Sequence, residues 1–95
     1  MRPAKNQLEK DIESECCDYA EATGWFTCKF VSPGTRGVPD RLFIRNGVHV
    51  FGEFKKPGEE PTAQQTLRHK KMRRHGAIVF WWDNYDQFKR NIDAL

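Results

Sequence analysis

An Asn-Gly pair at positions 46 and 47, with β-prone segments on both sides, is the feature that most constrains how this chain folds. Asn-Gly between such segments is the strongest short-range signal for a two-residue β-hairpin turn. If these two residues form the turn, residues that face each other across the hairpin have numbers that add up to 93. The pattern therefore predicts two antiparallel strands and also their register.

This register brings three charged residues together at the open end of the predicted hairpin. Asp40 lies opposite Glu53, and Lys55 shares the face of Glu53 because side chains alternate along a strand. Two carboxylates that face each other repel, so a sequence selected only for folding would not favour the pair without a nearby cation. Hard divalent cations such as Mg²⁺ are commonly held by one or two carboxylates. The register thus predicts a metal site, and the alternative is a solvated Asp and Glu on a surface hairpin.

The residues around these carboxylates resemble a known nuclease signature. The Pro-Asp pair that ends at Asp40 and the Glu-Phe-Lys tripeptide that ends at Lys55 are similar to the PD-(D/E)XK pattern. The longer forms, Gly-Val-Pro-Asp-Arg and Gly-Glu-Phe-Lys-Lys-Pro-Gly, resemble the VRR-NUC branch of these nucleases in its stand-alone phage or bacterial type. The resemblance spans most of the chain.

The resemblance implies a metal-dependent endonuclease that hydrolyses phosphodiester bonds in DNA with Mg²⁺ or Mn²⁺ as cofactor. Asp40, Glu53 and the Phe54 backbone carbonyl would bind the metal ion, and Lys55 would orient the attacking water or stabilise the transition state. It also implies branched DNA such as a Holliday junction as substrate, a homodimer, and the cytoplasm of a bacterial cell or phage-infected host. The alternative is a nucleic-acid-binding module that keeps this fold and does not cut.

The first predicted helix offers a further carboxylate for this site. Apolar residues recur at three- and four-residue intervals over residues 5–23. At about 100° per residue, Glu9 lies at the border of the apolar stripe, whereas Glu13 lies further from it and looks more exposed. The resembled nucleases commonly place a first-helix glutamate at the metal. We therefore expect Glu9 there, with Glu13 as its rival and an ordinary helix glutamate as the alternative.

A second predicted helix, over residues 62–75 with Gly76 as its C-cap, begins with Thr62 and Gln65 at the spacing of a capping box. A cap of this kind would be a complete structural role for Gln65. The resemblance instead places such a glutamine at the edge of the active site, as a catalytic residue. The two roles are compatible, and both remain open.

Positive charge gathers at residues 68–74, where five of seven side chains are Lys or Arg, although the net charge of the chain is only +3. Such a cluster beside carboxylates suits a polyanionic substrate, while the common explanation of a charge run is a solvated helix face. The candidate nucleic-acid contacts are Arg36, Arg41, Lys56, Arg68 and Lys71.

The remaining segments complete an α/β fold. Residues 25–31 read as a strand, and the apolar run 77–82 predicts a strand that is buried on both faces and parallel to its neighbour across a helical crossover. A final helix follows, capped by Asp83 or Asn84. The predicted core is αβββαβα, a mixed four-stranded sheet flanked by helices, in one domain over residues 1–95. Gly52, inside a predicted strand, suggests close approach of another backbone or a ligand.

Cysteine spacing and hydropathy exclude several classes. Three cysteines without a CxxC pair argue against a disulfide framework and a structural zinc site, and favour reduced thiols in a cytosol. No segment approaches the length of a membrane span, and the N-terminus lacks an apolar signal-peptide core. We therefore expect no membrane partner.

Overall fold

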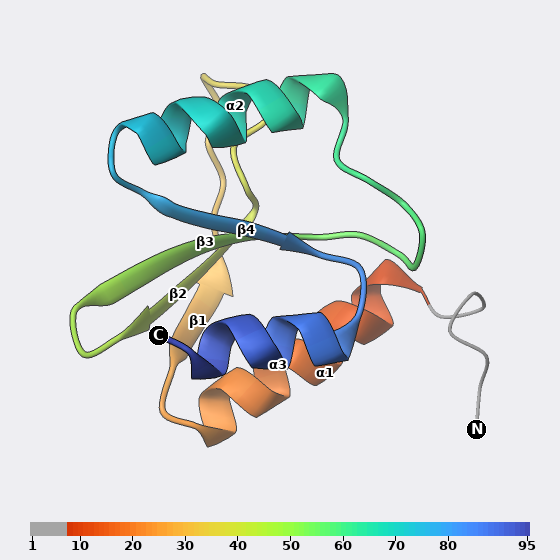
Figure 1. Ribbon diagram of the computed structural model, residues 1–95, viewed down its shortest axis with the longest axis vertical. Coiled ribbons are helices and arrows are strands. Elements are labelled where there is room, and N and C mark those ends of the chain that lie inside the picture. The colour runs from red at the N-terminus through yellow and green to blue at the C-terminus, as the bar shows by residue number, and fades with distance from the viewer. Residues whose placement is uncertain (1–7) are drawn as a thin grey trace.

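The computed structural model describes residues 8–95, which form four strands and three helices. In chain order they are α1 (Glu9–Ala22), β1 (Phe26–Lys29), β2 (Arg41–Arg45), β3 (Val48–Phe54), α2 (Ala63–Arg74), β4 (Ile78–Trp82) and α3 (Tyr85–Asp93). The strands form one sheet in the order β1-β2-β3-β4. Helices α1 and α3 lie side by side against one face of the sheet, and α2 covers the other (Figure 1). The predicted α/β fold and its αβββαβα order are confirmed.

The central hairpin has the register that the Asn-Gly turn predicted. Asn46 has a φ of 49° and Gly47 a φ of 81°, the positive values that a type I′ turn requires. The paired residues run from Arg45 with Val48 to Arg41 with Gly52, and the numbers of each pair add up to 93. Local turn chemistry therefore positions the whole hairpin.

Strand β4 pairs with β3 in parallel, as the helical crossover predicted. The expectation that β4 is buried on both faces is wrong in part. Val79 and Trp82 are buried, but Ile78, Phe80 and Trp81 are only partly covered. The reason is that β4 is an edge strand, with a neighbour on one side alone.

Three predicted boundaries shift by a few residues. The first helix was expected from about residue 5, and residues 5–7 lie outside the described range; Leu8 is an extended N-cap, so the helix begins at Glu9. Strand β1 is shorter than residues 25–31 because the Trp25 N–H bonds to the Ala20 carbonyl, 2.9 Å away, in the turn that ends α1. Helix α2 ends at Arg74 and its C-cap is His75, one residue before the glycine that we expected in that position.

The main core lies between the sheet and the pair α1 and α3. Its centre is a group of four aromatic rings, those of Phe43, Phe54, Trp82 and Phe88, with centroids 4.7 to 6.3 Å apart. Gly52 lies under this group, and a Cβ atom there would be 2.4 Å from the Trp82 ring. The close neighbour of Gly52 is thus a side chain, whereas the sequence suggested a backbone or a ligand.

Alternation along β3 assigns its other side chains to the opposite face. Val50 and Phe54 belong to the core against α1 and α3, while Phe51 lines a groove shared with Met72 of α2. Glu53, two residues after Phe51, therefore lies on the α2 side of the sheet. Among the helices of the described range, not one combines the length and the apolar character needed to cross a membrane.

Candidate active site

The structure brings Asp40, Glu53 and Lys55 to one end of the hairpin. Asp40 immediately precedes β2, Glu53 is the penultimate residue of β3, and Lys55 immediately follows β3. The last hydrogen-bonded ladder pair joins Arg41 and Gly52, so the same register continued by one residue sets Asp40 opposite Glu53. The backbone carbonyl of Asp40 accepts a hydrogen bond of 2.8 Å from the Phe30 N–H, which holds the residue against the end of β1.

Both carboxylates have a raised pKa, although a lysine lies near each of them. Burial and the negative charge of Asp40, opposed by the positive charge of Lys55, raise the pKa of Glu53 to about 7. Burial also raises the pKa of Asp40, against the positive charge of Lys29. One carboxylate oxygen of Asp40, Oδ1, is buried without a hydrogen-bond partner among the described residues. A buried acceptor without a donor is costly, and a bound cation would satisfy it.

The Phe54 carbonyl is left without a partner by the sheet itself. The Lys55 N–H donates to the Trp82 carbonyl, 2.8 Å away, so the neighbouring Phe54 directs its own carbonyl toward β2. The hairpin register continued to this position sets Pro39 opposite Phe54. Proline has no N–H to donate. The Phe54 carbonyl is therefore available to a metal ion beside the two carboxylates.

These donors fit a hard divalent cation. Within residues 8–95, no group of three or more His, Cys, Asp and Glu side chains is close enough to hold a metal ion. Two carboxylates and a carbonyl are nevertheless a sufficient protein contribution for Mg²⁺, which usually keeps several water molecules and binds substrate phosphates as its other ligands. The donor set therefore suits an ion shared between protein, water and substrate.

Lys55 occupies the position that the Glu-x-Lys spacing predicted. Its residue is 9% exposed, and its positive charge lowers the pKa of both Glu53 and Glu9. In the part of the chain that the structure describes, the ion pairs within 4.0 Å join other residues, so Lys55 is not tied to Glu53 in a structural pair. Its ammonium group lies within electrostatic reach of both carboxylates and remains free to contact a substrate.

The two candidate glutamates of α1 have different surroundings. The Glu13 carboxylate is 2.9 Å from the Lys29 ammonium and 3.5 Å from the Arg41 guanidinium. Its side chain is only 12% exposed, so the expectation that Glu13 is the more solvent-exposed candidate is not met. These two cations cover and neutralise it.

Glu9, the first residue of α1, is in the electrostatic field of the site. Burial raises its pKa, which Lys55 opposes and Asp40 reinforces. Glu9 thus feels the charge of Lys55, whereas Glu13 forms ion pairs with two cations. A metal role for Glu9 stays a prediction.

Gln65 forms the predicted capping box. Its side-chain oxygen accepts a hydrogen bond of 2.9 Å from the Thr62 N–H, and its own N–H donates to the Thr62 hydroxyl over 3.1 Å. The cap uses the side-chain oxygen and leaves the amide NH₂ group, a donor of two hydrogen bonds, outside it. The structural role is confirmed, and the catalytic role stays a prediction.

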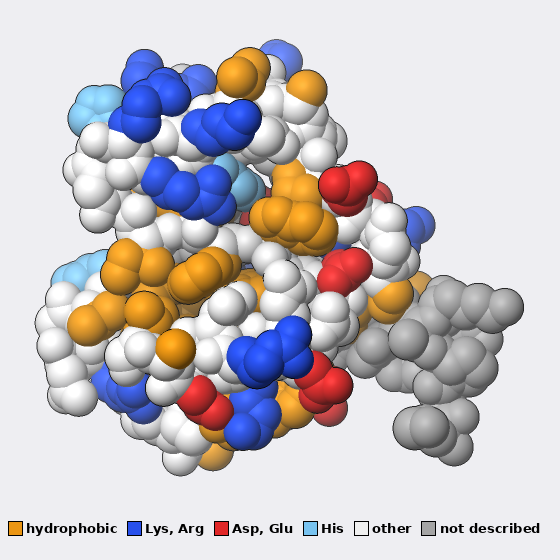
Figure 2. Space-filling model, viewed as in Figure 1, with side chains coloured by type: hydrophobic (Ala, Val, Ile, Leu, Met, Phe, Trp, Pro, Cys, Tyr) orange, Lys and Arg blue, Asp and Glu red, His pale blue; other side chains and the backbone are white. Residues whose placement is uncertain are grey.

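The five candidate nucleic-acid contacts fall into two groups. Arg41 is used internally, since its Nε donates to the Thr27 hydroxyl over 3.1 Å and its Nη1 lies 3.5 Å from Glu13. The other four, Arg36, Lys56, Arg68 and Lys71, lie on the loops beside the site or on α2. Figure 2 shows Lys and Arg side chains gathered over α2 at the top of the molecule. An internal role for Arg41 makes it the weakest of the five candidates.

His69 is a residue beside the site that sequence reasoning missed. It is the buried residue of α2, 2% exposed, and its Nε2 has no hydrogen-bond partner within residues 8–95. Burial, together with the charges of Arg73 and Lys55, lowers the pKa of His69 to about 4. The available signal was its spacing, since His69 follows Gln65 by four residues and so shares its helix face.

Glu53 and His69 give opposite pH dependences of stability. The folded chain holds a proton on Glu53 up to a pH of about 7, whereas the unfolded chain releases it near its ordinary pKa of 4.5. The stabilising contribution of Glu53 is therefore complete below pH 4.5 and is lost as pH rises through 7. For His69 the pKa falls from 6.5 to about 4, so its contribution is lost as pH falls through that range.

We expect Glu53→Gln to remove the loss of stability that Glu53 causes as pH rises and to leave the pH dependence that His69 causes. In EDTA, the free energy of unfolding of the wild type relative to the variant should fall by an amount on the order of 3 kcal/mol between about pH 4.5 and 7. The variant alone should gain stability as pH rises from about 4 to 6.5. Urea titrations at intervals across this range measure both, and parallel curves for the two proteins would contradict the buried, proton-binding Glu53.

Known proteins that are similar to this chain in sequence and in structure show its family. No family model matches the chain. A protein described as "Putative nuclease p44", from Acyrthosiphon pisum secondary endosymbiont phage 1, is 42% identical over 79 residues, which is 82% of this chain and 85% of that protein. A solved structure described as a VRR_NUC domain superposes with a TM-score of 0.81 at 29% identity, covering 90% of this chain and 94% of the other. The chain belongs to the VRR-NUC family of nucleases.

Proposed function

We propose that this chain is a metal-dependent endonuclease that hydrolyses phosphodiester bonds in DNA. The observation that carries the proposal is the pair Asp40 and Glu53 at the end of the hairpin. Both have a raised pKa, Glu53 is buried, and Oδ1 of Asp40 is buried without a hydrogen-bond partner among the described residues. Folding alone disfavours such a pair. A site of this kind is what a divalent ion and a phosphate group would complete.

Asp40, Glu53 and the Phe54 carbonyl would hold Mg²⁺ or Mn²⁺, with Glu9 as a further donor at the edge of the site. When bound, such an ion lowers the pKa of a water molecule and neutralises charge that develops on the scissile phosphate. The raised pKa of Glu53 makes the bound state pH-dependent, because the carboxylate must lose its proton to act as a ligand.

Lys55 would act on the reacting group directly. Its ammonium group donates hydrogen bonds to the attacking water or to a non-bridging oxygen of the scissile phosphate, where negative charge grows in the transition state. Its near-complete burial strengthens such a contact, because less water competes for the charge. Gln65 would donate its amide NH₂ to the same phosphate while its oxygen remains in the cap.

DNA would approach from the α2 side of the sheet. Helix α2 covers this face, and its last turn carries Lys71, Arg73 and Arg74, although the guanidinium of Arg73 is bonded to the Val79 carbonyl. Lysine and arginine near a backbone phosphate provide the salt-dependent part of DNA affinity. Lys56, which is exposed next to Lys55, and Arg36 on the loop before β2 would add contacts close to the cleaved bond.

The finer form of the proposal is structure-specific cutting of branched DNA, such as a Holliday junction, by a homodimer in the cytoplasm of a bacterial cell or phage-infected host. The family resemblance supports the substrate. Exposed apolar side chains near edge strand β1, Phe26 at 59% and Val31 at 80%, are compatible with burial between two copies. Two active sites would then reach two strands of one junction.

The test is a cleavage panel with supercoiled plasmid, linear duplex and a synthetic four-way junction, each in Mg²⁺, Mn²⁺ or EDTA. We expect product with either metal ion and none in EDTA, and faster cutting of the junction than of the duplex. Sedimentation at the same protein concentration reports the oligomeric mass. No product from any substrate in either metal ion would refute the enzyme, and DNA binding without cleavage would identify a binding module.

A further inference from the structure

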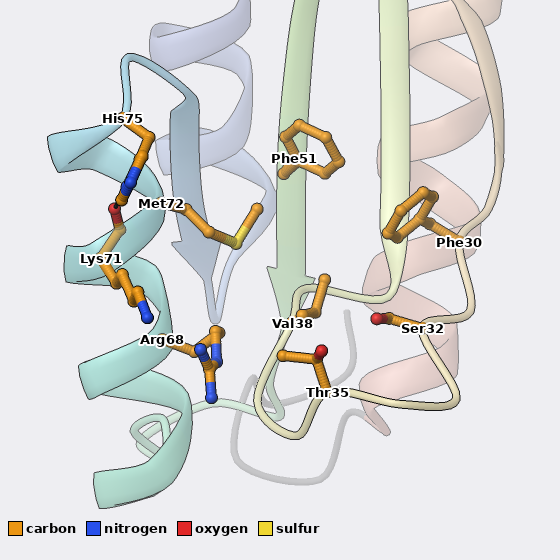
Figure 3. A pocket seen from close by; sticks show the side chains of 9 residues that line it. All are labelled: Phe30, Ser32, Thr35, Val38, Phe51, Arg68, Lys71, Met72 and His75. Carbon is orange, nitrogen blue, oxygen red and sulfur yellow. Dashed lines mark hydrogen bonds between the residues drawn. The ribbon is translucent and has the colours of Figure 1, made fainter.

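An open groove of about 340 Å³ lies beside the active site, between α2, β3 and the loop that precedes β2 (Figure 3). Its apolar lining comes from Phe30, Val38, Phe51 and Met72, and its basic rim from Arg68 and Lys71 of α2. In Figure 3 the Met72 side chain reaches from α2 toward Phe51, whose ring lies over β3, and the Phe30 ring lies farther from the helix. The groove has the size of a small-ligand site.

The rings of Phe30 and Phe51 are arranged so that a planar group of a ligand can stack on them. Phe30 and Phe51 meet edge to face, with centroids 5.4 Å apart and planes at 77°. Both side chains remain partly exposed, so ring surface is open to the groove. Aromatic rings of this kind stack on nucleobases in a way that tolerates any base, since every base has a π-face.

Two residues of the groove lie next to the carboxylates. Phe51 and Glu53 lie on the same face of β3, two residues and so roughly 7 Å apart along the strand. Phe30 donates its N–H to the carbonyl of Asp40 over 2.8 Å. A group that fills the groove would therefore lie next to whatever occupies the site of Asp40 and Glu53.

The positive charge of Arg68 and Lys71 at the rim of the groove favours a negatively charged ligand. Lys71 is exposed, and Arg68 is held in place by a hydrogen bond of 2.9 Å from its Nε to the Arg36 carbonyl, which leaves its terminal nitrogens outside that bond. Cations above an aromatic floor match a chain that alternates phosphate charge with planar apolar groups. Single-stranded nucleic acid has this pattern.

We propose that this groove binds an unpaired nucleobase of the DNA substrate, next to the phosphodiester bond that is cut. This inference rests on the proposed nuclease function for its choice of DNA. A base within an intact duplex is stacked on both faces and cannot enter, whereas an unpaired base can leave the stack at little cost. The groove therefore makes unpaired DNA the preferred substrate class.

The test compares two fluorescent duplexes of one sequence, fully paired or with a short run of unpaired thymines, in EDTA so that neither is cut. We expect the wild type to bind the second at least about tenfold more tightly. Phe51→Leu keeps the apolar volume and loses the ring face, so it should abolish this preference and leave affinity for the paired duplex unchanged. Phe80→Leu, on the opposite face of the sheet, is the matched control and should keep the preference.

Lys71→Gln separates base stacking from charge. It should weaken binding of both duplexes alike and reduce the slope of log affinity against log salt by about one, because a phosphate contact carries no base information. Thermal melts of all three variants establish that they fold. With 5-iodouracil among the unpaired bases, ultraviolet crosslinks should map to Phe30 or Phe51.

Several results would overturn the groove as a nucleobase site. The first is equal affinity of the wild type for both duplexes, and the second is a preference that stays intact in Phe51→Leu. The third is loss of a dimer in that variant, with equal changes in its affinity for the two duplexes. That third result would make the groove an interface between copies. If the preference exists and depends on Phe51 while no substrate of the cleavage panel is cut in Mg²⁺ or Mn²⁺, the groove stands and the nuclease proposal fails.

Discussion

Replacing Asp40 with asparagine is expected to abolish metal-dependent cleavage while it stabilises the metal-free protein. The amide keeps the shape of the carboxylate but removes the negative charge that would bind the metal ion. Loss of a preorganised electrostatic group at a reaction centre commonly costs about 10²- to 10³-fold in rate, and loss of a metal ligand should reach the upper end. Single-turnover cleavage in saturating Mg²⁺ measures the effect.

The stability of the same variant should change in the opposite direction. Above pH 7, where Glu53 has lost its proton, removal of the Asp40 charge relieves the repulsion that helps to raise the Glu53 pKa. A gain of about 1 kcal/mol corresponds to about 4–8 °C in Tm for a domain of this size. Mg²⁺ should raise the Tm of the wild type by mass action and leave the variant unchanged.

Asp18→Asn, at an exposed position of α1, is the control and should alter neither property. Lost activity combined with gained stability separates a functional role from a structural one. If Asp40 served folding, Asp40→Asn would lose stability and activity together. Full activity in Asp40→Asn, or a lower Tm in EDTA, would show that the carboxylate is not a metal ligand.

The second large effect is expected from Gly52→Ala. A Cβ atom at this position would be 2.4 Å from Cζ3 and 2.9 Å from Cη2 of Trp82, and 3.2 Å from Cε1 of Phe43. Both rings are fully buried, and the Trp82 indole N–H is held by Asn91 at 2.9 Å. Neither ring can move without disturbing the aromatic group at the centre of the core.

We expect a loss of about 3 kcal/mol, at the upper end of the cost of overpacking a core. This corresponds to roughly 12–24 °C in Tm. Gly34→Ala is the matched control, because no atom lies within 4 Å of a Cβ there, and its Tm should stay near that of the wild type. Urea denaturation of Gly52→Ala in a Trp82→Phe background should show a smaller loss, as expected for two residues in direct conflict. Equal losses in both backgrounds would place the cost elsewhere.

The hairpin and its carboxylates were within reach of sequence reasoning. Asn46-Gly47 specifies a turn of two residues through local backbone preferences. The length of this turn then fixes the register of every pair up to Gly52. Asp40, Glu53 and Lys55 follow from that register by counting. Thr62 and Gln65 form their cap for a similar reason, since the two residues are only three positions apart in the chain.

Contacts between distant segments could not be read from these short-range rules. Glu13 was expected to be the more exposed glutamate, but Lys29 and Arg41 from two different strands enclose it. His69 carried a spacing signal relative to Gln65, yet its burial depends on how α2 lies against the sheet. The partial exposure of β4 depends on its place at the edge, which an apolar run does not reveal.

The amino-acid sequence by itself thus determined the turn, the register, the order of elements and the two facing carboxylates, because each depends on residues close together in the chain or on a repeating spacing. Only the tertiary structure decided which cations neutralise Glu13, which ring excludes a side chain at Gly52, and that Phe30, Phe51 and Met72 line one groove. These outcomes require segments far apart in the chain to meet, and their packing follows from the whole fold rather than from any local pattern.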